Sequence, residues 1–239
     1  MSHIQDALGR AERHLARRDY REAHGLCMAV LQADPGAARA WYLLGLLTAD
    51  HDNFHRAAEL FEKSAELDKR DPRPLTQLAR CKIALNLQAE AVQFAEAAAA
   101  LAPTDSLTLD TLGVVFSRAG LHARAIAFFE RACALTPANP EFQFNLAASR
   151  QFSGDFEGAE AAYAAALAGD PDLHRAWSSR VQLRRQTAEA NFIPELEALF
   201  ARPSDDPDRA LHLGHALAKS YEDLGEHETA LQWLLRAKA

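Results

Sequence analysis

Apolar and small side chains recur at helical spacing along this chain, in short stretches separated by turns. The clearest case lies between residues 106 and 139, where two amphipathic stretches flank Gly120. Each stretch places its apolar side chains three or four residues apart, as one face of an α-helix requires. These side chains are Leu109, Leu112 and Phe116 in the first stretch, and Ala125, Phe129 and Ala132 in the second. The pattern predicts a helical hairpin that is too small to fold alone.

The same pattern returns every 34 residues. The alanine of the second helix recurs as Ala23, Ala57, Ala91, Ala125 and Ala159. The small residue of the first helix recurs as Gly45, Ala79, Gly113 and Ala147. We expect these small residues to lie where helix backbones approach closely, with Phe61, Phe129 and Tyr163 filling the space beside them. We predict five repeats, at residues 4–37, 38–71, 72–105, 106–139 and 140–173.

The period breaks after residue 173. Residues 191–201 are typical of a displaced helix that carries Pro194 in its first turn, where proline is tolerated. Residues 202–208 are rich in proline and aspartate and predict a loop. The period then resumes, with Ala230 lying 71 residues after Ala159 where two periods would give 68. We therefore predict an irregular helical segment at 174–210 and a final hairpin at 211–239.

A helix–turn–helix of this period, with large residues near its start as in Trp41–Tyr42–Leu43–Leu44–Gly45, resembles the tetratricopeptide repeat (TPR) family. The resemblance covers nearly the whole chain. It implies an all-α fold, a right-handed TPR superhelix (α-solenoid) of antiparallel helix pairs.

Residues 174–239 are also similar to the junction in bacterial proteins whose TPR repeats precede a sulfotransferase domain. The catalytic part of that family binds a nucleotide phosphosulfate through a turn rich in glycine, serine and threonine that leads into a helix. This sequence contains no such turn. The resemblance therefore transfers no catalytic or cofactor residue to this chain.

Composition narrows the function further. A net charge of -7 argues against nucleic-acid binding, which requires a basic surface to neutralise phosphates. The sequence has no apolar run long enough to span a membrane and no signal-peptide core at its start. Its three cysteines (Cys27, Cys81 and Cys133) lack CxxC spacing, and we expect Cys27 to be a reduced core residue. We predict a cytoplasmic protein that does not bind nucleic acid or membrane.

Common catalytic patterns are missing from the sequence. It has no glycine-rich phosphate loop, no GxSxG and no HExxH. The histidine pairs His51/His55 and His212/His215 could each touch one metal ion, but neither has an evident third ligand. We therefore expect no catalytic residue, no cofactor and no metal, and a chain that is not itself an enzyme.

Binding is the remaining expectation, because in the TPR family the first helix of each repeat lines a concave groove. The first-helix positions opposite the core are more basic than the net charge suggests, which suits an extended peptide, including one with acidic groups. We expect the groove to contain Arg39, Tyr42, Arg73, Gln77, Arg80, Asp110, Arg118, Phe144, Asn145, Gln151, Arg175 and Gln182. The alternative is that these arginines form local ion pairs on a solvated face, each contributing little.

The last predicted helix has an apolar side that includes Leu231, Trp233, Leu234 and Leu235. Repeat arrays usually end in a polar capping helix, so we expect either a longer parent chain or a molecule that covers this side. Three functions stay open. The first is a scaffold that binds a protein or peptide in the groove without catalysis. The second is the substrate-recognition region of a sulfotransferase whose catalytic domain is missing here. The third is a self-assembly module, such as a homodimer, formed through Leu231, Leu234 and Leu235.

Overall fold

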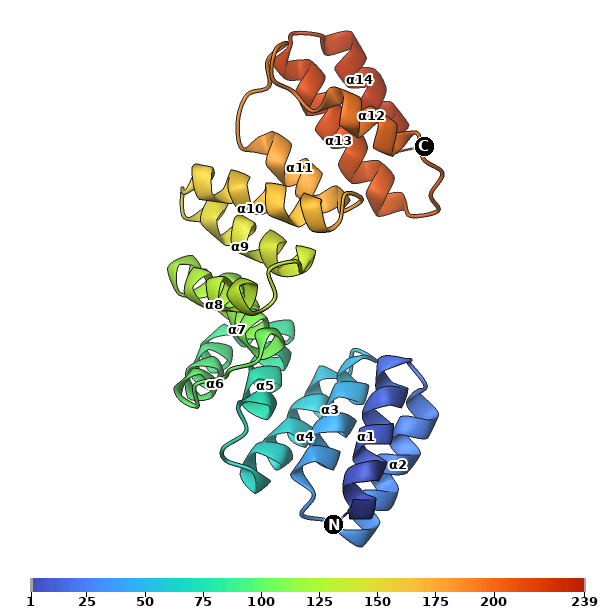
Figure 1. Ribbon diagram of the computed structural model, residues 1–239, viewed down its shortest axis with the longest axis vertical. Coiled ribbons are helices and arrows are strands. Elements are labelled where there is room, and N and C mark those ends of the chain that lie inside the picture. The colour runs from blue at the N-terminus through green and yellow to red at the C-terminus, as the bar shows by residue number, and fades with distance from the viewer. Residues whose placement is uncertain (1, 239) are drawn as a thin grey trace. The chain divides into compact units, whose positions relative to one another are not determined.

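The computed structural model describes residues 2–238, which form α-helices joined by turns and contain no strand (Figure 1). The helices in chain order are α1 (Ser2–Ala16), α2 (Tyr20–Ala33), α3 (Ala38–Ala49), α4 (Phe54–Leu67), α5 (Pro72–Ala84), α6 (Gln88–Ala100), α7 (Ser106–Arg118), α8 (His122–Leu135), α9 (Pro140–Phe152), α10 (Phe156–Gly169), α11 (His174–Gln182), α12 (Ile193–Phe200), α13 (Pro207–Asp223) and α14 (His227–Arg236). The prediction of an all-α fold is confirmed.

The chain forms two compact units, Met1–Ala125 and Ile126–Ala239, which we call the N-terminal unit and the C-terminal unit. In the N-terminal unit α1 packs on α2, α3 on α4, and α5 on α6, and each pair contacts the next through α2 with α3 and α4 with α5. In the C-terminal unit α9 packs on α10, α10 on α11, and α13 contacts α11, α12 and α14. Below, the odd-numbered helices from α1 to α9 are called first helices, and the even-numbered helices from α2 to α10 second helices.

Three first helices begin at a side chain that caps their exposed backbone N–H groups. Asp71, Asp105 and Asn139 lie 34 residues apart, and each accepts a hydrogen bond of 2.8–3.0 Å from the first turn of the helix that follows. Such caps satisfy donors that have no partner inside the helix. The start of the helix is therefore specified by a short polar residue that repeats with the period.

The turn between the two helices of a repeat requires one residue in the left-handed region. This residue is glycine in the fourth and fifth repeats, where Gly120 and Gly154 have φ near 80°. The equivalent residues in the first three repeats are Arg18, Asp52 and Asn86, with φ of 57–61°. Glycine adopts this conformation without a steric penalty, whereas an arginine does not. The turn is thus conserved in geometry across the repeats, although glycine occupies it in only two of these five.

The core contains one large aromatic side chain in each of three second helices. Phe61, Phe129 and Tyr163 are almost completely buried. A Cβ atom added to Gly45 would lie 2.5–2.9 Å from ring carbons of Phe61. In this repeat the small residue therefore makes room for an aromatic ring, where we had expected the approach of two backbones.

The three cysteines are buried, and none of them forms a disulfide. Burial raises the pKa of Cys27 to about 11, with Glu12 adding to the effect. Burial also raises the pKa of Cys81 to about 11, although Arg80 and Lys82 oppose it. Both side chains are therefore neutral thiols, and the expectation that Cys27 is a core residue is confirmed.

The irregular segment forms most of the surroundings of the last hairpin. Helix α12 begins at Ile193 and carries Pro194 in its first turn, as predicted. Helix α13 begins at Pro207, so the predicted loop ends slightly too late. Trp233 was expected on the open side of the last helix, which is wrong. It is buried, and the ring of Phe200 from α12 packs edge-on against it at 5.1 Å.

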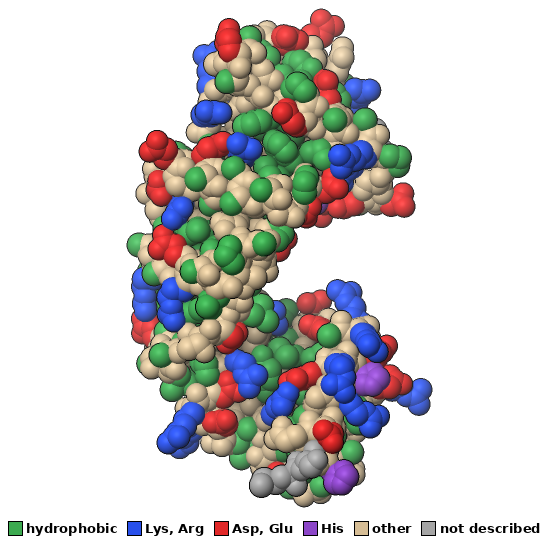
Figure 2. Space-filling model, viewed as in Figure 1, with side chains coloured by type: hydrophobic (Ala, Val, Ile, Leu, Met, Phe, Trp, Pro, Cys, Tyr) green, Lys and Arg blue, Asp and Glu red, His purple; other side chains and the backbone are tan. Residues whose placement is uncertain are grey.

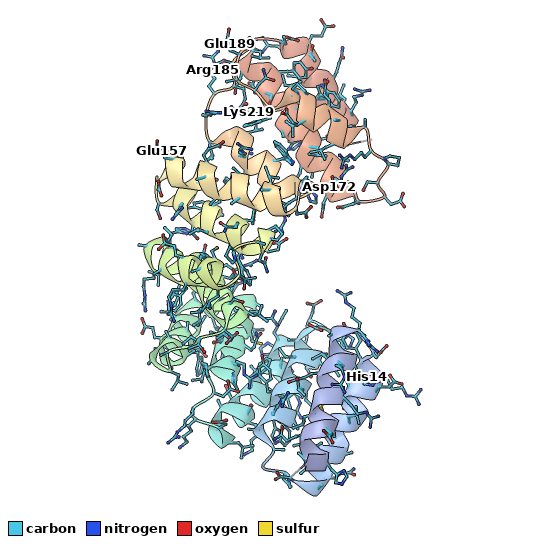
Figure 3. All side chains as sticks on the ribbon, viewed as in Figure 1. His14, Glu157, Asp172, Arg185, Glu189 and Lys219 are labelled. Atoms are coloured by element: carbon cyan, nitrogen blue, oxygen red, sulfur yellow. The ribbon has the colours of Figure 1, made fainter. Side chains whose placement is uncertain are left out.

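Asp223 fastens the loop after α11 to α13. Its carboxylate accepts a hydrogen bond from the backbone N–H of Gln186 (2.7 Å) and pairs with Lys219. Its backbone carbonyl accepts from the guanidinium of Arg185 at 3.1 and 3.3 Å. Figure 3 shows Arg185 and Lys219 on the same side of the C-terminal unit. Burial alone would raise the pKa of Asp223, but the hydrogen bonds from Lys219 and Gln186 outweigh it and lower the pKa.

We expect Gly45→Ala to lower the free energy of unfolding by about 1–3 kcal/mol, because the added methyl group meets the buried Phe61 ring. Gly25→Ala in α2 is the matched control, since nothing lies within 4 Å of its Cβ position. Alanine is favoured over glycine inside a helix by roughly 0.5–1 kcal/mol, so this control should be neutral or stabilising. Urea unfolding followed by circular dichroism measures both. Equal stabilities for the two variants would show that Gly45 is not tightly packed.

We expect Asp223→Asn to destabilise the chain more at about pH 7 than at about pH 3. The folded-state pKa of Asp223 lies below its usual value, so its stabilisation is present above the unfolded-state pKa and is lost as the pH falls through the folded-state pKa. Urea unfolding at the two pH values measures the difference. Asp205→Asn, at an exposed loop position, is the control and should show no such change. An equal loss at both pH values for Asp223→Asn would contradict the lowered pKa.

Candidate peptide-binding surfaces

The first helices α3, α5 and α7 bring together the predicted groove residues of the N-terminal unit, and several of these residues are already paired. Arg39 forms an ion pair with Glu12 of α1, with its Nε 2.8 Å from a carboxylate oxygen. Arg73 binds both oxygens of Asp71 at 2.7–3.0 Å. The hydrogen bond and charge of Asp71 raise the pKa of Arg73 further, although burial opposes this effect. Both arginines therefore behave as the alternative interpretation of local ion pairs predicts.

Tyr42 lies beside Arg73 at the same surface. The guanidinium carbon of Arg73 is 5.3 Å from the centre of the Tyr42 ring, and the Phe61 ring lies 5.8 Å away on the core side. Burial raises the pKa of Tyr42 to about 12. Its hydroxyl group therefore stays protonated, and it has no hydrogen-bond partner among the described residues. The hydroxyl group of Tyr42 can therefore donate a hydrogen bond to a ligand.

Arg80 and Arg118 differ from the other predicted arginines. Neither has an ion-pair partner in the described part of the chain, and the Nε atom of the half-buried Arg80 is buried without a hydrogen bond. Both line a cavity of 250 Å³. The other lining residues are apolar, namely Phe54, Ile83, Ala84, Val114 and Val115. Here an apolar cavity carries two guanidinium groups with no acidic residue among its lining.

Two predicted groove residues of this unit face the interior. Gln77 and Asp110 are each only 8% exposed. Gln77 occupies the position of Leu43 one repeat earlier, which is also buried. A side chain there points toward the neighbouring helix and offers no surface to a ligand. The Oε1 atom of Gln77 has no hydrogen-bond partner within residues 2–238.

The C-terminal unit repeats the stacked arrangement around Tyr42. Arg175 lies 4.8 Å from the centre of the Phe144 ring and pairs with Glu141 at 2.7–2.9 Å. The Phe144 ring is 5.8 Å from that of Tyr163. Tyr163 in turn donates a hydrogen bond of 2.8 Å to Gln151. These predicted residues thus form a structural stack in which the arginine and the glutamine already have partners.

The other two predicted residues of the C-terminal unit, Asn145 and Gln182, differ from each other in exposure. Asn145 is half-buried on α9, whereas Gln182 is exposed at the end of α11. Gln182 lines a separate cavity of 430 Å³ together with residues of α13 and α14, which include Leu231 and Leu234. This cavity belongs to the last hairpin.

The predicted assembly face lies on α14. Leu231 and Leu235 are 57% and 64% exposed, and Leu234 is also exposed. Hydrophobic side chains are visible on the surface of the C-terminal unit in Figure 2. The same view shows Lys and Arg side chains gathered over α1 and α2 in the N-terminal unit.

Within residues 2–238, no three His, Cys, Asp or Glu side chains are grouped as a metal site would require. None of the helices in this range is long and apolar enough to cross a membrane.

Phe54 and Ile83 line the cavity of Arg80 but were not predicted as site residues. Phe54 is the first residue of a second helix, whereas the prediction considered only first helices. Ile83 lies three residues after Arg80 on α5, so its helical spacing was a signal that could have found it.

Comparison with known proteins supports the repeat assignment. Residues 3–98 match the family model described as anaphase-promoting complex, cyclosome, subunit 3, and residues 118–183 match a tetratricopeptide repeat model. No curated protein matches the chain. The resemblance to sulfotransferase-linked proteins receives no support from these comparisons.

Solved structures share the fold at low sequence identity. A chain of the APC/C hetero-tetramer Cut9-Hcn1 is 18% identical over 99% of this chain, with a TM-score of 0.67, and this chain spans 43% of its length. The pilF protein of Pseudomonas aeruginosa is 20% identical, with a TM-score of 0.66 and coverage of 94% of this chain and 95% of that one. YrrB, a TPR protein with an unusual peptide-binding site, is 16% identical, with a TM-score of 0.58 and coverage of 86% and 96%.

These likenesses establish the all-α TPR solenoid as the fold. The repeat model and the 34-residue period of small and aromatic residues agree with it. Residues 118–183 match the tetratricopeptide repeat family, and the chain has the fold of a TPR solenoid.

Proposed function

We propose that this chain is a protein-interaction scaffold that binds an extended peptide, with no catalysis of its own, through the surface of α3, α5 and α7. The observation that carries the proposal is the cavity lined by Arg80 and Arg118, two arginines that have no carboxylate partner in the described part of the chain and that lie beside an apolar floor. The structurally similar YrrB is described as having a peptide-binding site, which agrees with this use of the fold.

The charges of the cavity favour an acidic group in the ligand. Arg39 and Arg73 on the same surface are neutralised by Glu12 and Asp71. Arg80 has no such partner between residues 2 and 238, and a buried donor left without a hydrogen bond costs about 1–3 kcal/mol. A carboxylate from a ligand would supply the missing acceptor through charge-assisted hydrogen bonds.

The size of the cavity favours a peptide over a larger small molecule. Its 250 Å³ lies just below the roughly 300–1,000 Å³ of small-molecule pockets. A single apolar side chain of the peptide would contact Phe54 and Val114 there. The peptide backbone on either side would follow the neighbouring first helices. Tyr42 lies on this surface with a hydroxyl group available to a peptide carbonyl.

We also propose that the protein works in a reducing compartment such as the cytoplasm. Its three cysteines are buried and form no disulfide, which suits an environment in which thiols stay reduced.

The test selects peptides from a random decapeptide library with the full chain and compares variants on the selected sequences. We expect enrichment of Asp or Glu beside an apolar residue. Binding to Arg80→Glu/Arg118→Glu should be at least about tenfold weaker, because both cations are reversed. Arg70→Glu/Arg184→Glu is the matched control, with the same charge change at exposed positions outside this cavity. Fluorescence anisotropy measures binding, and circular dichroism checks the fold.

Undiminished binding to the Arg80→Glu/Arg118→Glu variant would place the site elsewhere. Selection of basic peptides in place of acidic ones would contradict the charge argument. Either outcome rejects the proposal as stated.

A second candidate function is self-association through α14, favoured by the exposure of Leu231 and Leu235. We expect sedimentation equilibrium to show a dimer whose dissociation constant rises at least about tenfold in Leu235→Glu, because a charge replaces buried apolar surface at the interface. Leu107→Glu, at another exposed leucine of a first helix, is the control. A monomer at all concentrations would exclude this candidate.

A further inference from the structure

A second cavity of the N-terminal unit lies between the second helices α2 and α4, over a different side of α3 from the surface proposed above. Its volume is 390 Å³, which falls within the range of about 300–1,000 Å³ typical of ligand pockets. Leu31, Trp41, Leu44 and Leu60 form most of its apolar lining. The repeat pattern does not require a cavity here. Other pairs of neighbouring second helices have larger or charged side chains at the equivalent positions.

Two periods later along the chain, the equivalent space is filled. The residues equivalent to Met28, Thr48 and Arg56 of the cavity are Glu96, Phe116 and Arg124, respectively. Arg124 reaches from its own helix to Glu96 on α6, with an N–O distance of 2.6 Å. Its guanidinium group also lies 4.4 Å from the centre of the Phe116 ring. An aromatic ring and an ion pair thus cover the junction between these repeats.

One period further, an ion pair covers the junction without the aromatic ring. Glu130 and Arg150 hold the positions equivalent to 28 and 48. They pair at 2.8 Å. A glutamate at the first of these positions therefore accepts a cation from the next repeat in both junctions.

The junction between the first two repeats keeps the arginine, as Arg56, but lacks the glutamate and the aromatic ring of the later junction. Met28 replaces the glutamate and is 40% exposed at the cavity. Thr48 replaces the ring or the arginine, and its hydroxyl group donates to the carbonyl of Leu44 at 2.7 Å. Because position 28 is not a glutamate, Arg56 has no acidic side chain there to bind, and it pairs with Glu59 on its own helix. Both members of that pair are about 60% exposed, so it contributes little stability.

We propose that this cavity binds an apolar side chain of a partner peptide that carries an acidic residue next to it. The lining contains Arg56 but no Asp or Glu among the described residues, since Glu59, the partner of Arg56, is not part of it. Because that exposed ion pair is weak, Arg56 can exchange Glu59 for an acidic group at the rim of the cavity. The acidic residue of the partner takes the place that Glu96 takes two repeats later. The apolar side chain takes the place of the Phe116 ring.

The indole of Trp41 is the anchor of this site. Its Nε1 donates a hydrogen bond of 3.0 Å to the carbonyl of Pro35, which fixes the ring and leaves its faces for apolar contact. Rigid aromatic side chains that need no further partner are frequent centres of protein interfaces. The cavity has one arginine and few other polar groups, which is too little to orient a small polar ligand. A peptide adds contacts along α2 and α4 on either side.

The probe for the test is the single methionine of the cavity. The chain has two methionines, Met1 and Met28, so protein labelled with ¹³C in the methionine methyl groups gives two assignable signals. Met28→Leu identifies the signal of Met28. The ligands are the tripeptides acetyl-Glu-Trp-Glu-amide and acetyl-Lys-Trp-Lys-amide, which share the aromatic ring and differ in charge.

We expect the acidic tripeptide to shift the Met28 signal in a saturable way, and to bind at least about tenfold more tightly than the basic one. Thr48→Phe copies the side chain that fills the equivalent space at Phe116, and should abolish the shift. Arg56→Glu should weaken the acidic tripeptide at least about tenfold and leave the fold intact. Arg70→Glu is the matched control and should bind as the unchanged protein does.

The Arg80→Glu/Arg118→Glu variant separates this site from the surface of α3, α5 and α7, and it should still respond at Met28. Absence of any Met28 shift at millimolar peptide would overturn the proposal. Equal affinity for the two tripeptides, or unchanged affinity in Arg56→Glu, would overturn the assignment of an acidic partner. If Thr48→Phe unfolds, the comparison of Arg56→Glu with Arg70→Glu decides alone.

Discussion

Each helical hairpin of this chain has more apolar surface than its own two helices can cover, so a neighbouring repeat must bury the remainder. This constraint fixes the core. Phe61, Phe129 and Tyr163 are buried at equivalent positions of the 34-residue period, and Gly45 leaves room for one of these rings. It also fixes the turn, since the left-handed residue recurs even where an arginine must adopt it. The residue type that a position accepts therefore depends more on whether the side chain is buried between two repeats than on the helix that carries it.

Positions outside the core can change chemistry without changing the fold. The second-helix position held by Met28 is occupied by Glu96 and Glu130 in later repeats, and both glutamates take part in ion pairs across the junction. These three junctions have the same helices in the same order, yet the first has a largely apolar cavity where the other two have ion pairs. A repeat scaffold thus separates fold from function, because a site depends on which copies depart from the common pattern.

The sequence was sufficient to predict the helix pairs, the aromatic core positions and the displaced helix at Pro194, because each leaves a local or periodic signal. It was insufficient for Trp233. That side chain is covered by Phe200 from α12, a helix outside the period, so the repeat pattern could not place its partner. The start of α13 was missed for another reason. Asp206 followed by Pro207 is a capped helix start, but a segment rich in proline and aspartate also resembles a loop.

Charge was the hardest property to interpret from the sequence. The first helices are rich in arginine, yet the partner of Arg39 is 27 residues away and that of Arg73 is only two residues away. No single spacing connects an arginine to its carboxylate, so the number of arginines overestimates the charge available to a ligand. Within the described residues Arg80 and Arg118 have no ion-pair partner, and the other residues of their cavity are valine, isoleucine, alanine and phenylalanine. Available charge therefore depends on the apolar residues around an arginine, which exclude the acidic partner that would otherwise neutralise it.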